Sequence, residues 1–175
     1  MRSAILSLCY ILFTFASAAV SSEIAGQARV IDGDTFSIRK TRIRIAAIDA
    51  CERDQTGVKR GQIWPCGIEA RRSLAKMIDG RHVRCVQIDT DQYRRLVGQC
   101  FIEGDDIGLR MVKLGQAVLL LRYLPATHPL DLNEYRLAEA EARRLRHGIW
   151  AARVEPPWLY RRKASRDASH DVWPN

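Results

Sequence analysis

Two apolar–polar alternations, separated by a short polar break, occupy residues 30–52 and constrain the fold more than any other stretch. The first alternation follows Asp32-Gly33-Asp34, the break falls at Lys40–Thr41, and the second alternation ends at Asp49. Strict alternation is the pattern of half-buried strands, and two such runs around a tight turn predict a β-hairpin. The segment is therefore expected to form two paired strands, over 36–39 and 42–48.

Carboxylates crowd the two outer ends of this predicted hairpin. Asp32 and Asp34 precede its first strand, and Asp49 and Glu52 follow its second. Because paired strands lie about 5 Å apart, folding the hairpin brings these acids to one end. Like charges held close together repel one another unless a positive group lies among them. The sequence therefore predicts a hard cation or arginine side chains at this end of the hairpin.

The remaining patterns predict a small α+β domain. Further strands are expected over 27–31, 81–88, 96–102 and 117–121, and helices over 68–78, 107–114 and 134–147. Gly80, Gly115 and Gly148 follow the three helical patterns, at positions where glycine commonly ends a helix. Residues 52–67 are polar and contain glycine and proline, so we expect a loop there. Tight turns between strands suggest a five-stranded OB-type barrel with about three packed helices, although composition alone does not select this barrel.

The first residues have the composition of an export signal. Arg2 is the only charge in the first 22 residues, residues 4–15 are largely apolar, and Ala16-Ser17-Ala18 offers small residues for cleavage. This pattern predicts a signal peptide over 1–18 that is removed. The alternative is a membrane anchor, but the apolar run is shorter than the about 20 residues that span a bilayer. A cleaved signal implies an exported protein, periplasmic or secreted, with no stable membrane insertion.

Signal removal would leave four cysteines, Cys51, Cys66, Cys85 and Cys100. An even number in an exported chain suggests two disulfides, for which three connectivities are possible. Cys85 and Cys100 lie in two strand-like runs that flank a turn and could face each other, which would make Cys51–Cys66 the second bridge. Free buried thiols are one alternative. A four-cysteine zinc site is another, disfavoured because no paired C-x-x-C spacing is present.

The chain is basic, with a net charge of +8, which favours polyanionic partners such as nucleic acid or an anionic surface. From residue 151 it becomes rich in proline, arginine and serine. We expect 151–175 to be a basic, flexible tail that is disordered from Ala164 to Asn175. The run Arg161-Arg162-Lys163 could add salt-dependent affinity for phosphates, although such runs are more often solvated chain ends.

Five ordered motifs resemble the staphylococcal nuclease, or thermonuclease, family. They are VIDGDT at 30–35, RIAAIDACE at 44–52, DQYRR at 91–95, VKLGQA at 112–117, and the segment 138–150 that closes with HGIW. The resemblance covers about 26–150 and implies an OB-fold barrel with helices packed on it. It also implies calcium-dependent hydrolysis of phosphodiester bonds in DNA and RNA. We expect such a domain to act as a monomer.

The resemblance assigns roles to the crowded acids. Asp34 and Asp49 match direct calcium ligands. Ala50 matches a position that offers its backbone carbonyl, and Asp32 would bind the ion through water. Glu52 matches the carboxylate that orients or deprotonates the attacking water. A lone Asp-Gly-Asp is usually a turn, and the second acidic cluster is what favours the metal site.

Two arginines match the residues that hold the phosphate in this family, Arg44 and Arg95. A guanidinium suits this role because its planar fork reaches two phosphate oxygens and stays protonated. Arg42 alternates with Arg44 on the same strand, but the five-residue offset to Asp49 favours Arg44. Arg94 competes with Arg95, and it occupies a position where the family usually has glycine.

Further matches concern substrate contacts and the loop after the metal-binding segment. Tyr93 and Tyr123 match nucleotide contacts, with partly buried tyrosines as the alternative. Cys51 stands where the family usually has proline, which restricts φ. We hypothesise that a Cys51–Cys66 disulfide restores that restraint.

These observations leave three functional interpretations. The favoured one is an exported, calcium-dependent nuclease that attacks phosphodiesters with water. The second is an OB module that binds nucleic acid but has lost catalysis, although such a module is expected to lose one of the acids or arginines. The third is a small structural or inhibitory domain held by disulfides, which gives no reason for acids and arginines to converge.

Overall fold

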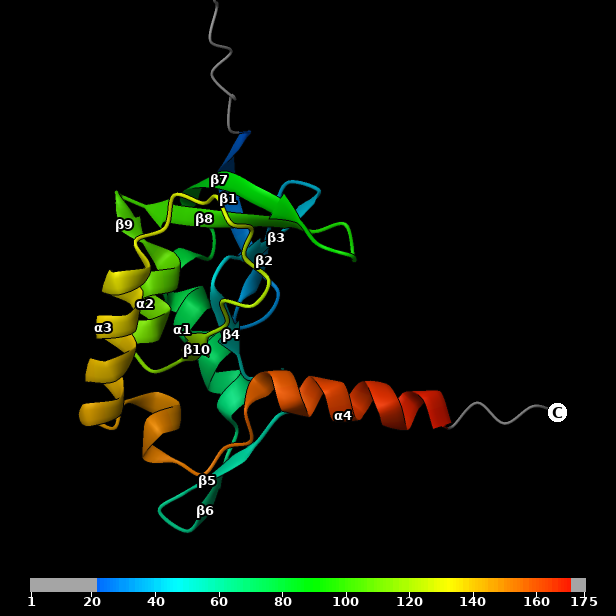
Figure 1. Ribbon diagram of the computed structural model, residues 1–175, viewed down its shortest axis with the longest axis vertical. Helices are drawn as coiled ribbons and strands as arrows, with labels where there is room; N and C mark the ends of the chain where they lie inside the picture. Colours follow the sequence, from blue (N-terminus) through cyan, green and yellow to red (C-terminus); the bar gives the residue numbers. More distant parts are fainter. Residues whose placement is uncertain (1–21, 171–175) are drawn as a thin grey trace, which may run out of the picture.

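A computed structural model of the 175-residue chain describes residues 22–170, and side chains as far as residue 166. The predicted signal peptide over 1–18 lies outside the described residues. A β-barrel forms one end of the molecule, and helices pack beneath it (Figure 1). Within residues 22–170, no helix combines the length and the apolar character needed to cross a membrane.

Five strands close the barrel: β1 (Glu23–Val30), β2 (Thr35–Ile38), β3 (Thr41–Ile45), β7 (His82–Thr90) and β8 (Leu96–Ile102). Their order is β3-β2-β1-β7-β8 with antiparallel neighbours, and a parallel pairing of β3 with β8 completes the ring. The short β9 (Asp105–Asp106) pairs with β8 at its edge. The predicted α+β class and five-stranded OB-type barrel are confirmed.

The hairpin predicted from the alternating pattern is β2–β3. Thr35 pairs with Arg44 and Ile38 pairs with Thr41, so the turn falls at residues 39–40 as expected. Phe36 and Ile43 face the barrel interior and are completely buried. Because side chains alternate between the two faces of a strand, the same register turns Arg44 away from this core.

The second predicted strand is split in two. β3 stops at Ile45, the chain turns through Ala46 and Ala47, and β4 (Ile48–Ala50) starts a separate ladder with β10 (Ala117–Leu119). The physical reason is the left-handed backbone of Ala47, at φ 64°, which breaks the extended path. The strand expected over 117–121 therefore pairs outside the barrel.

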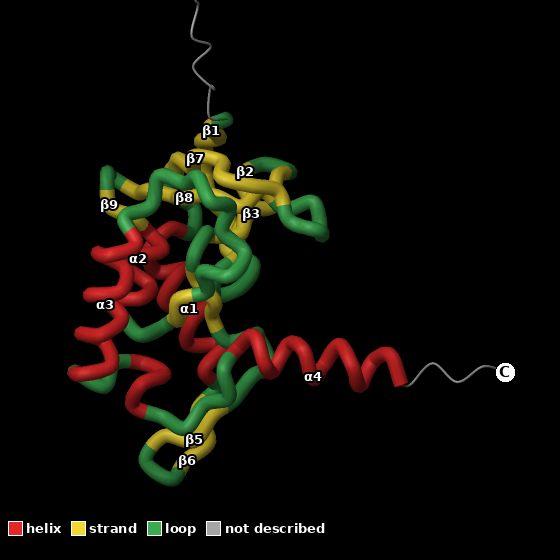
Figure 2. The backbone as a smooth tube through the Cα atoms, in the orientation of Figure 1, coloured by secondary structure: helices red, strands yellow, loops and turns green. Residues whose placement is uncertain are grey.

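The α-helices lie beneath the barrel, and the last of them projects away from the others (Figure 2). They are α1 (Cys66–Ile78), α2 (Ile107–Lys113), α3 (Leu132–Arg144) and α4 (Pro157–His170), and a 3₁₀ turn, η1, spans Gly148–Ala151. The first three correspond to the predicted helices. The fourth was not predicted.

Helix α4 corrects the expectation of a flexible tail that is disordered from Ala164, as far as His170; residues 171–175 lie outside the described residues. Pro157 occupies its first position, where a missing N–H costs nothing and φ is already helical. Leu159 and Tyr160 both donate backbone hydrogen bonds to the carbonyl of Pro156, which closes the first turn. Arginine, lysine and alanine, all good helix formers, follow over 161–164. Proline content therefore marked a helix start here, rather than disorder.

The segment expected to be a loop, 52–67, contains a small hairpin of β5 (Gly57–Lys59) and β6 (Gln62–Trp64). Both disulfides suggested by the cysteine count are formed. Cys51–Cys66 joins the end of β4 to the start of α1, and Cys85–Cys100 crosses directly opposed positions of β7 and β8. Free thiols and a four-cysteine zinc site are therefore not the arrangement of these residues.

Candidate active site

An arginine joins the two acidic ends of the hairpin. Arg44 on β3 places Nη1 2.8 Å from Asp34 Oδ2 and Nη2 2.9 Å from Asp49 Oδ1. Asp34 lies on the turn before β2, and Asp49 lies in the middle of β4. The break at Ala47 is what returns the chain so that Asp49 faces Arg44. The prediction of an arginine among the converging acids is confirmed.

The two bridged carboxylates are buried, and they differ in how fully their oxygens are hydrogen-bonded. Asp34 Oδ1 accepts a hydrogen bond from Thr35 Oγ1 at 2.8 Å, and Asp34 Oδ2 lies 3.5 Å from the backbone nitrogen of Ala50. Asp49 is 0% exposed, and its Oδ2 has no hydrogen-bond partner. A buried carboxylate oxygen without a donor is costly, because it has lost its water and gained nothing in return.

This donor set fits a hard cation. Asp34 and Asp49 supply carboxylate oxygens, one of them unpartnered, and such ions bind carboxylates, backbone carbonyls and water. Ala50 adjoins Asp49 on β4, and Asp32 lies on the turn beside Asp34. No group of three or more acidic, histidine or cysteine side chains in residues 22–170 is already arranged as a metal cage. A bound ion would therefore need water or substrate oxygens as well.

A second arginine, Arg161 of α4, enters the same cluster. Its Nη2 lies 2.7 Å from Asp49 Oδ1, and its Nη1 lies 2.5 Å from Glu52 Oε1. Sequence reasoning missed this contact. The only available signal was the basic run 161–163, which gave no spacing relative to the acids more than a hundred residues earlier.

Burial and arginine contacts act in opposite directions on these acids. Burial raises the pKa of Asp49 and of Glu52 above their ordinary values, although the charge of Arg161 works against both shifts. Burial also raises the pKa of Asp32. For Arg161 itself, burial disfavours the charged form, but Asp49 and Glu52 outweigh it and raise its pKa. Arg161 therefore opposes, without cancelling, the effect of burial on the pKa of Asp49 and of Glu52.

Arg95 is held by a turn rather than by the cluster. Its Nε donates to Asp91 Oδ2 at 2.7 Å, and the backbone nitrogens of Tyr93 and Arg95 donate to Asp91 Oδ1. Arg94 adopts φ 61°, the left-handed conformation that glycine adopts freely, so the turn keeps a glycine-like backbone. Arg95 Nη1 lies 3.5 Å from Thr35 Oγ1, beside Asp34.

An open cavity of about 860 Å³ exposes this cluster to solvent. Most predicted site residues line it, namely Asp32, Asp34, Arg44, Glu52, Tyr93, Arg95 and Tyr123. Asp49 and Ala50 are buried and do not line the cavity. Arg42 and Arg44 both line it, and Arg44 is the one that contacts Asp34 and Asp49. Arg95 lines the cavity, whereas Arg94 does not. Tyr93 and Tyr123 are 70% and 64% exposed, so the partly buried alternative is wrong.

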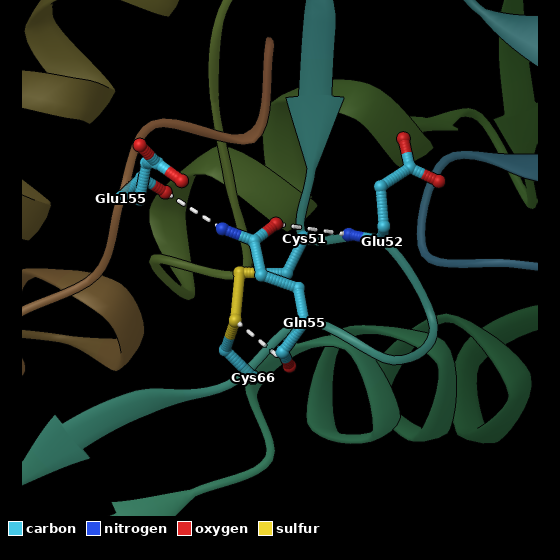
Figure 3. Close-up of a disulfide and its surroundings, with 5 residues drawn as sticks. All are labelled: Cys51, Glu52, Gln55, Cys66 and Glu155. Atoms are coloured by element: carbon cyan, nitrogen blue, oxygen red, sulfur yellow. Dashed lines mark hydrogen bonds between the residues drawn. A yellow bond between two sulfur atoms is a disulfide. The ribbon is translucent and has the colours of Figure 1, made fainter. Parts of the chain in front are cut away.

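The segment after Glu52 is tied down by Gln55 (Figure 3). Gln55 is only 1% exposed, its Oε1 accepts from the backbone nitrogen of Glu52 at 3.1 Å, and its own backbone nitrogen donates to the Glu52 carbonyl at 2.9 Å. The disulfide sulfur of Cys66 lies 3.4 Å from the Gln55 carbonyl oxygen. The Cys51–Cys66 bridge and Gln55 therefore restrain the same loop.

Comparison with known proteins gives the family of the chain. The sequence model of the family described as "Staphylococcal nuclease homologue" matches residues 42–152. Micrococcal nuclease of Shigella flexneri is 32% identical over 156 residues, which cover 81% of this chain and 82% of that protein. Succinoglycan biosynthesis protein ExoI of Rhizobium meliloti is 33% identical over 141 residues, which cover 79% of this chain and 70% of that protein.

A plant relative is longer. The probable staphylococcal-like nuclease CAN1 of Oryza sativa subsp. japonica is 32% identical over 131 residues, 74% of this chain but 35% of the rice protein. The fold and the site together define an OB-barrel protein with an acid–arginine centre at the base of the open cavity, which we call the groove. The chain belongs to the staphylococcal nuclease homologue family.

Proposed function

We propose that this protein is an exported, calcium-dependent nuclease that acts as a monomer and hydrolyses phosphodiester bonds of DNA and/or RNA. The observation that carries the proposal is the bridge from Arg44 to Asp34 and Asp49, with Glu52 beside it at an open groove. Relatives that are named nucleases support the activity. The predicted signal over 1–18 and the two disulfides support export.

The acids would hold the metal ion. Asp34 and Asp49 would bind it directly, Ala50 would offer its backbone carbonyl, and Asp32 would bind through water. When bound, the ion neutralises phosphate charge and makes a bound water more acidic. The unpartnered Oδ2 of Asp49 supports this assignment, because a cation would satisfy an oxygen that otherwise lies buried without a donor.

The arginines handle the phosphate. A phosphodiester is anionic and gains further charge in the five-coordinate transition state, so fixed positive donors stabilise the transition state more than the ground state. Arg44 is held at the acids by two contacts, and Arg95 is held by Asp91 with its guanidinium toward the groove. Both forks are therefore oriented before substrate arrives.

Glu52 acts on water, and the tyrosines act on bases. The Glu52 carboxylate lines the groove beside Asp34, where it orients the attacking water or accepts its proton at an Oε atom. Tyr93 and Tyr123 are exposed and line the same groove, and each ring lies under an arginine, Arg95 and Arg122 respectively. Exposed aromatic rings next to cations suit stacking with unpaired bases.

An inactive OB module that binds nucleic acid is the second candidate. The open groove with two exposed tyrosines favours binding, whether or not cleavage follows. The presence of Asp34, Asp49 and Glu52 together with both arginines favours catalysis. Acids repel a polyanion, so a groove that only bound nucleic acid would have no use for them.

The test is cleavage of single-stranded DNA by the oxidised protein, with calcium and then with chelator. Glu52→Gln is the diagnostic variant, and Glu103→Gln, an exposed acid paired with Arg81, is the matched control. We expect calcium-dependent cleavage that falls about 100-fold or more in Glu52→Gln and is unchanged in Glu103→Gln. Binding without cleavage by the wild type, in any divalent metal, would favour the second candidate.

A further inference from the structure

Helix α4 lies outside the family match yet reaches the centre of the site. The matched region ends at residue 152, and α4 begins at Pro157. The helix extends away from the other three helices (Figure 1), and its first turns pass beside β4. From there Arg161 contacts both Asp49 and Glu52. The role of this helix is therefore not explained by the family's own site residues.

Arg161 and Arg44 share one hydrogen-bond acceptor. Both guanidinium groups donate to the same atom, Asp49 Oδ1, at 2.7 Å from Arg161 and 2.9 Å from Arg44. The Arg161 side chain is 36% exposed and lines the groove, so it is neither a solvated chain end nor sealed from substrate. Two guanidinium groups from different elements, β3 and α4, therefore converge on one carboxylate oxygen.

The start of α4 is fixed to the loop that follows Glu52. Val58 and Arg153 exchange two backbone hydrogen bonds, at 2.9 and 2.8 Å. Gln55 Nε2 donates to the carbonyl oxygen of Glu155 at 2.7 Å. Because these contacts stand immediately before the first helical turn, the helix enters the groove at a defined angle, rather than as a free tail.

One face of α4 follows the groove. Trp158, Arg161, Arg162 and Ser165 all line the cavity, and their spacing places them along one side of a helix. Arg162 stacks over the Trp158 ring at 5.5 Å. Lys163, the residue after Arg162, instead forms an ion pair with Glu155. The groove face of α4 thus presents two arginines and an aromatic ring, which is the chemistry that binds a single strand.

We propose that α4 forms an additional wall of the substrate groove, with Arg161 as a third active-site arginine that contacts a phosphate of the bound strand beside Glu52. This inference rests on the proposed function for the identity of the substrate. A guanidinium carries five N–H donors, so Arg161 can keep a carboxylate contact while it donates to a phosphate oxygen. Asp49 and Glu52 hold the fork in place until the strand arrives.

Binding is measured first, without cleavage. Fluorescence anisotropy of a labelled single-stranded oligonucleotide in chelator, over a series of salt concentrations, compares the wild type with Arg161→Gln. Lys163→Gln is the matched control, because it removes the same charge two residues away on the same helix. We expect Arg161→Gln to weaken binding about tenfold, the effect of one charged hydrogen bond. Its salt slope should fall by about 0.7, the value for one phosphate contact to a single strand.

Equal affinity and salt slope for Arg161→Gln and the wild type would overturn the proposal, whatever the cleavage result. Arg161→Met, which keeps the side-chain length without charge, serves as the second neutral variant if the glutamine variant fails to fold. A loss of the same size in Lys163→Gln would also overturn it, because the effect would then be one of net charge alone.

Cleavage with calcium separates this inference from the proposed function. If the wild type cleaves and Arg161→Gln cleaves about tenfold or more slowly, both hold. If the wild type does not cleave but Arg161→Gln still loses affinity, the nuclease proposal fails and the α4 wall stands. Faster cleavage by Arg161→Gln would overturn the inference, because it would show that the ion pair with Arg161 inhibits Glu52.

Discussion

Gln55 donates a hydrogen bond from Nε2 to the backbone carbonyl of Glu155, at 2.7 Å and across 100 residues of sequence. The same amide accepts from the backbone nitrogen of Glu52. One buried side chain therefore connects the segment that carries the proposed water-activating carboxylate to the residue that leads into α4. The positions of the Glu52 loop and of the start of α4 therefore both depend on Gln55.

Replacing Gln55 by alanine should lower the free energy of unfolding by about 2–3 kcal/mol, because two hydrogen bonds are lost and the partly buried backbone groups of Glu52 and Glu155 lose their partner. Urea unfolding followed by circular dichroism measures this. Gln62→Ala is the control, since Gln62 is exposed on the neighbouring β6. Equal midpoints for both variants would mean that water replaces the amide without cost.

The two disulfides form a matched pair, because each closes 15 residues of sequence. Cys51→Ala/Cys66→Ala and Cys85→Ala/Cys100→Ala should each lose about 3 kcal/mol of stability through loop closure. Only the Cys51–Cys66 bridge restrains the loop after Glu52. At a temperature where both variants are folded, nuclease activity should therefore fall further in Cys51→Ala/Cys66→Ala than in Cys85→Ala/Cys100→Ala. Alkylation of Cys51 in the native, unreduced protein would contradict this prediction, because it would show a free thiol.

Asp91→Asn should impair Arg95 without unfolding the turn. An asparagine oxygen still accepts the backbone N–H groups of Tyr93 and Arg95, but the charge that holds the Arg95 fork at 2.7 Å is lost. We expect kcat/KM on single-stranded DNA to fall about tenfold, the effect of one charge-assisted hydrogen bond. Asp105→Asn, which removes an exposed partner of Arg110, serves as the control. A loss of equal size in both variants would refute the orienting role.

Asp91 also gives a pH dependence with a defined sign. Burial works against its ionisation, but the backbone N–H and guanidinium of Arg95 outweigh burial and hold the pKa below the ordinary 3.8. A carboxyl with a lowered pKa stabilises the folded state above its unfolded pKa and loses that contribution as pH falls through the folded value. The stability difference between wild type and Asp91→Asn should therefore shrink in acid unfolding below about pH 3.8. A difference that is constant between pH 7 and pH 2 would contradict this.

Tyr135→Phe tests the packing of α3 on α2. Tyr135 is 2% exposed, and its hydroxyl donates to Asp106 Oδ1 at 2.8 Å, the same oxygen that caps α2 through the backbone nitrogen of Leu109. We expect a loss of about 1.5–3 kcal/mol, the range for hydrogen bonds to charged groups. Thermal unfolding measures it, with the exposed Tyr93→Phe as control. Unchanged midpoints would mean that Asp106 finds another donor.

Local patterns were enough to predict the barrel hairpin and the acids at its ends. The alternation around Lys40–Thr41 has a period of two, and that period alone places Phe36 and Ile43 inside and sends Arg44 to the other face. The hairpin pattern also predicted that the acids at its ends converge, although Asp49 meets Arg44 only because the turn at Ala47 places it on β4. The family was also predictable, because its motifs are short segments that can be recognised in the sequence without the fold.

Only the tertiary structure decided which other groups complete the site. The turn at Ala47 lets β4 pair with β10 rather than continue β3. Alanine has no local preference for such a turn, so the sequence did not predict it. Arg161 reaches Glu52 from 109 residues away, and Gln55 reaches Glu155 from 100. Contacts of that kind leave no periodic signal, because their geometry is set by how β4, the disulfide-bonded loop and α4 pack together, and by the cost of leaving buried polar groups without partners.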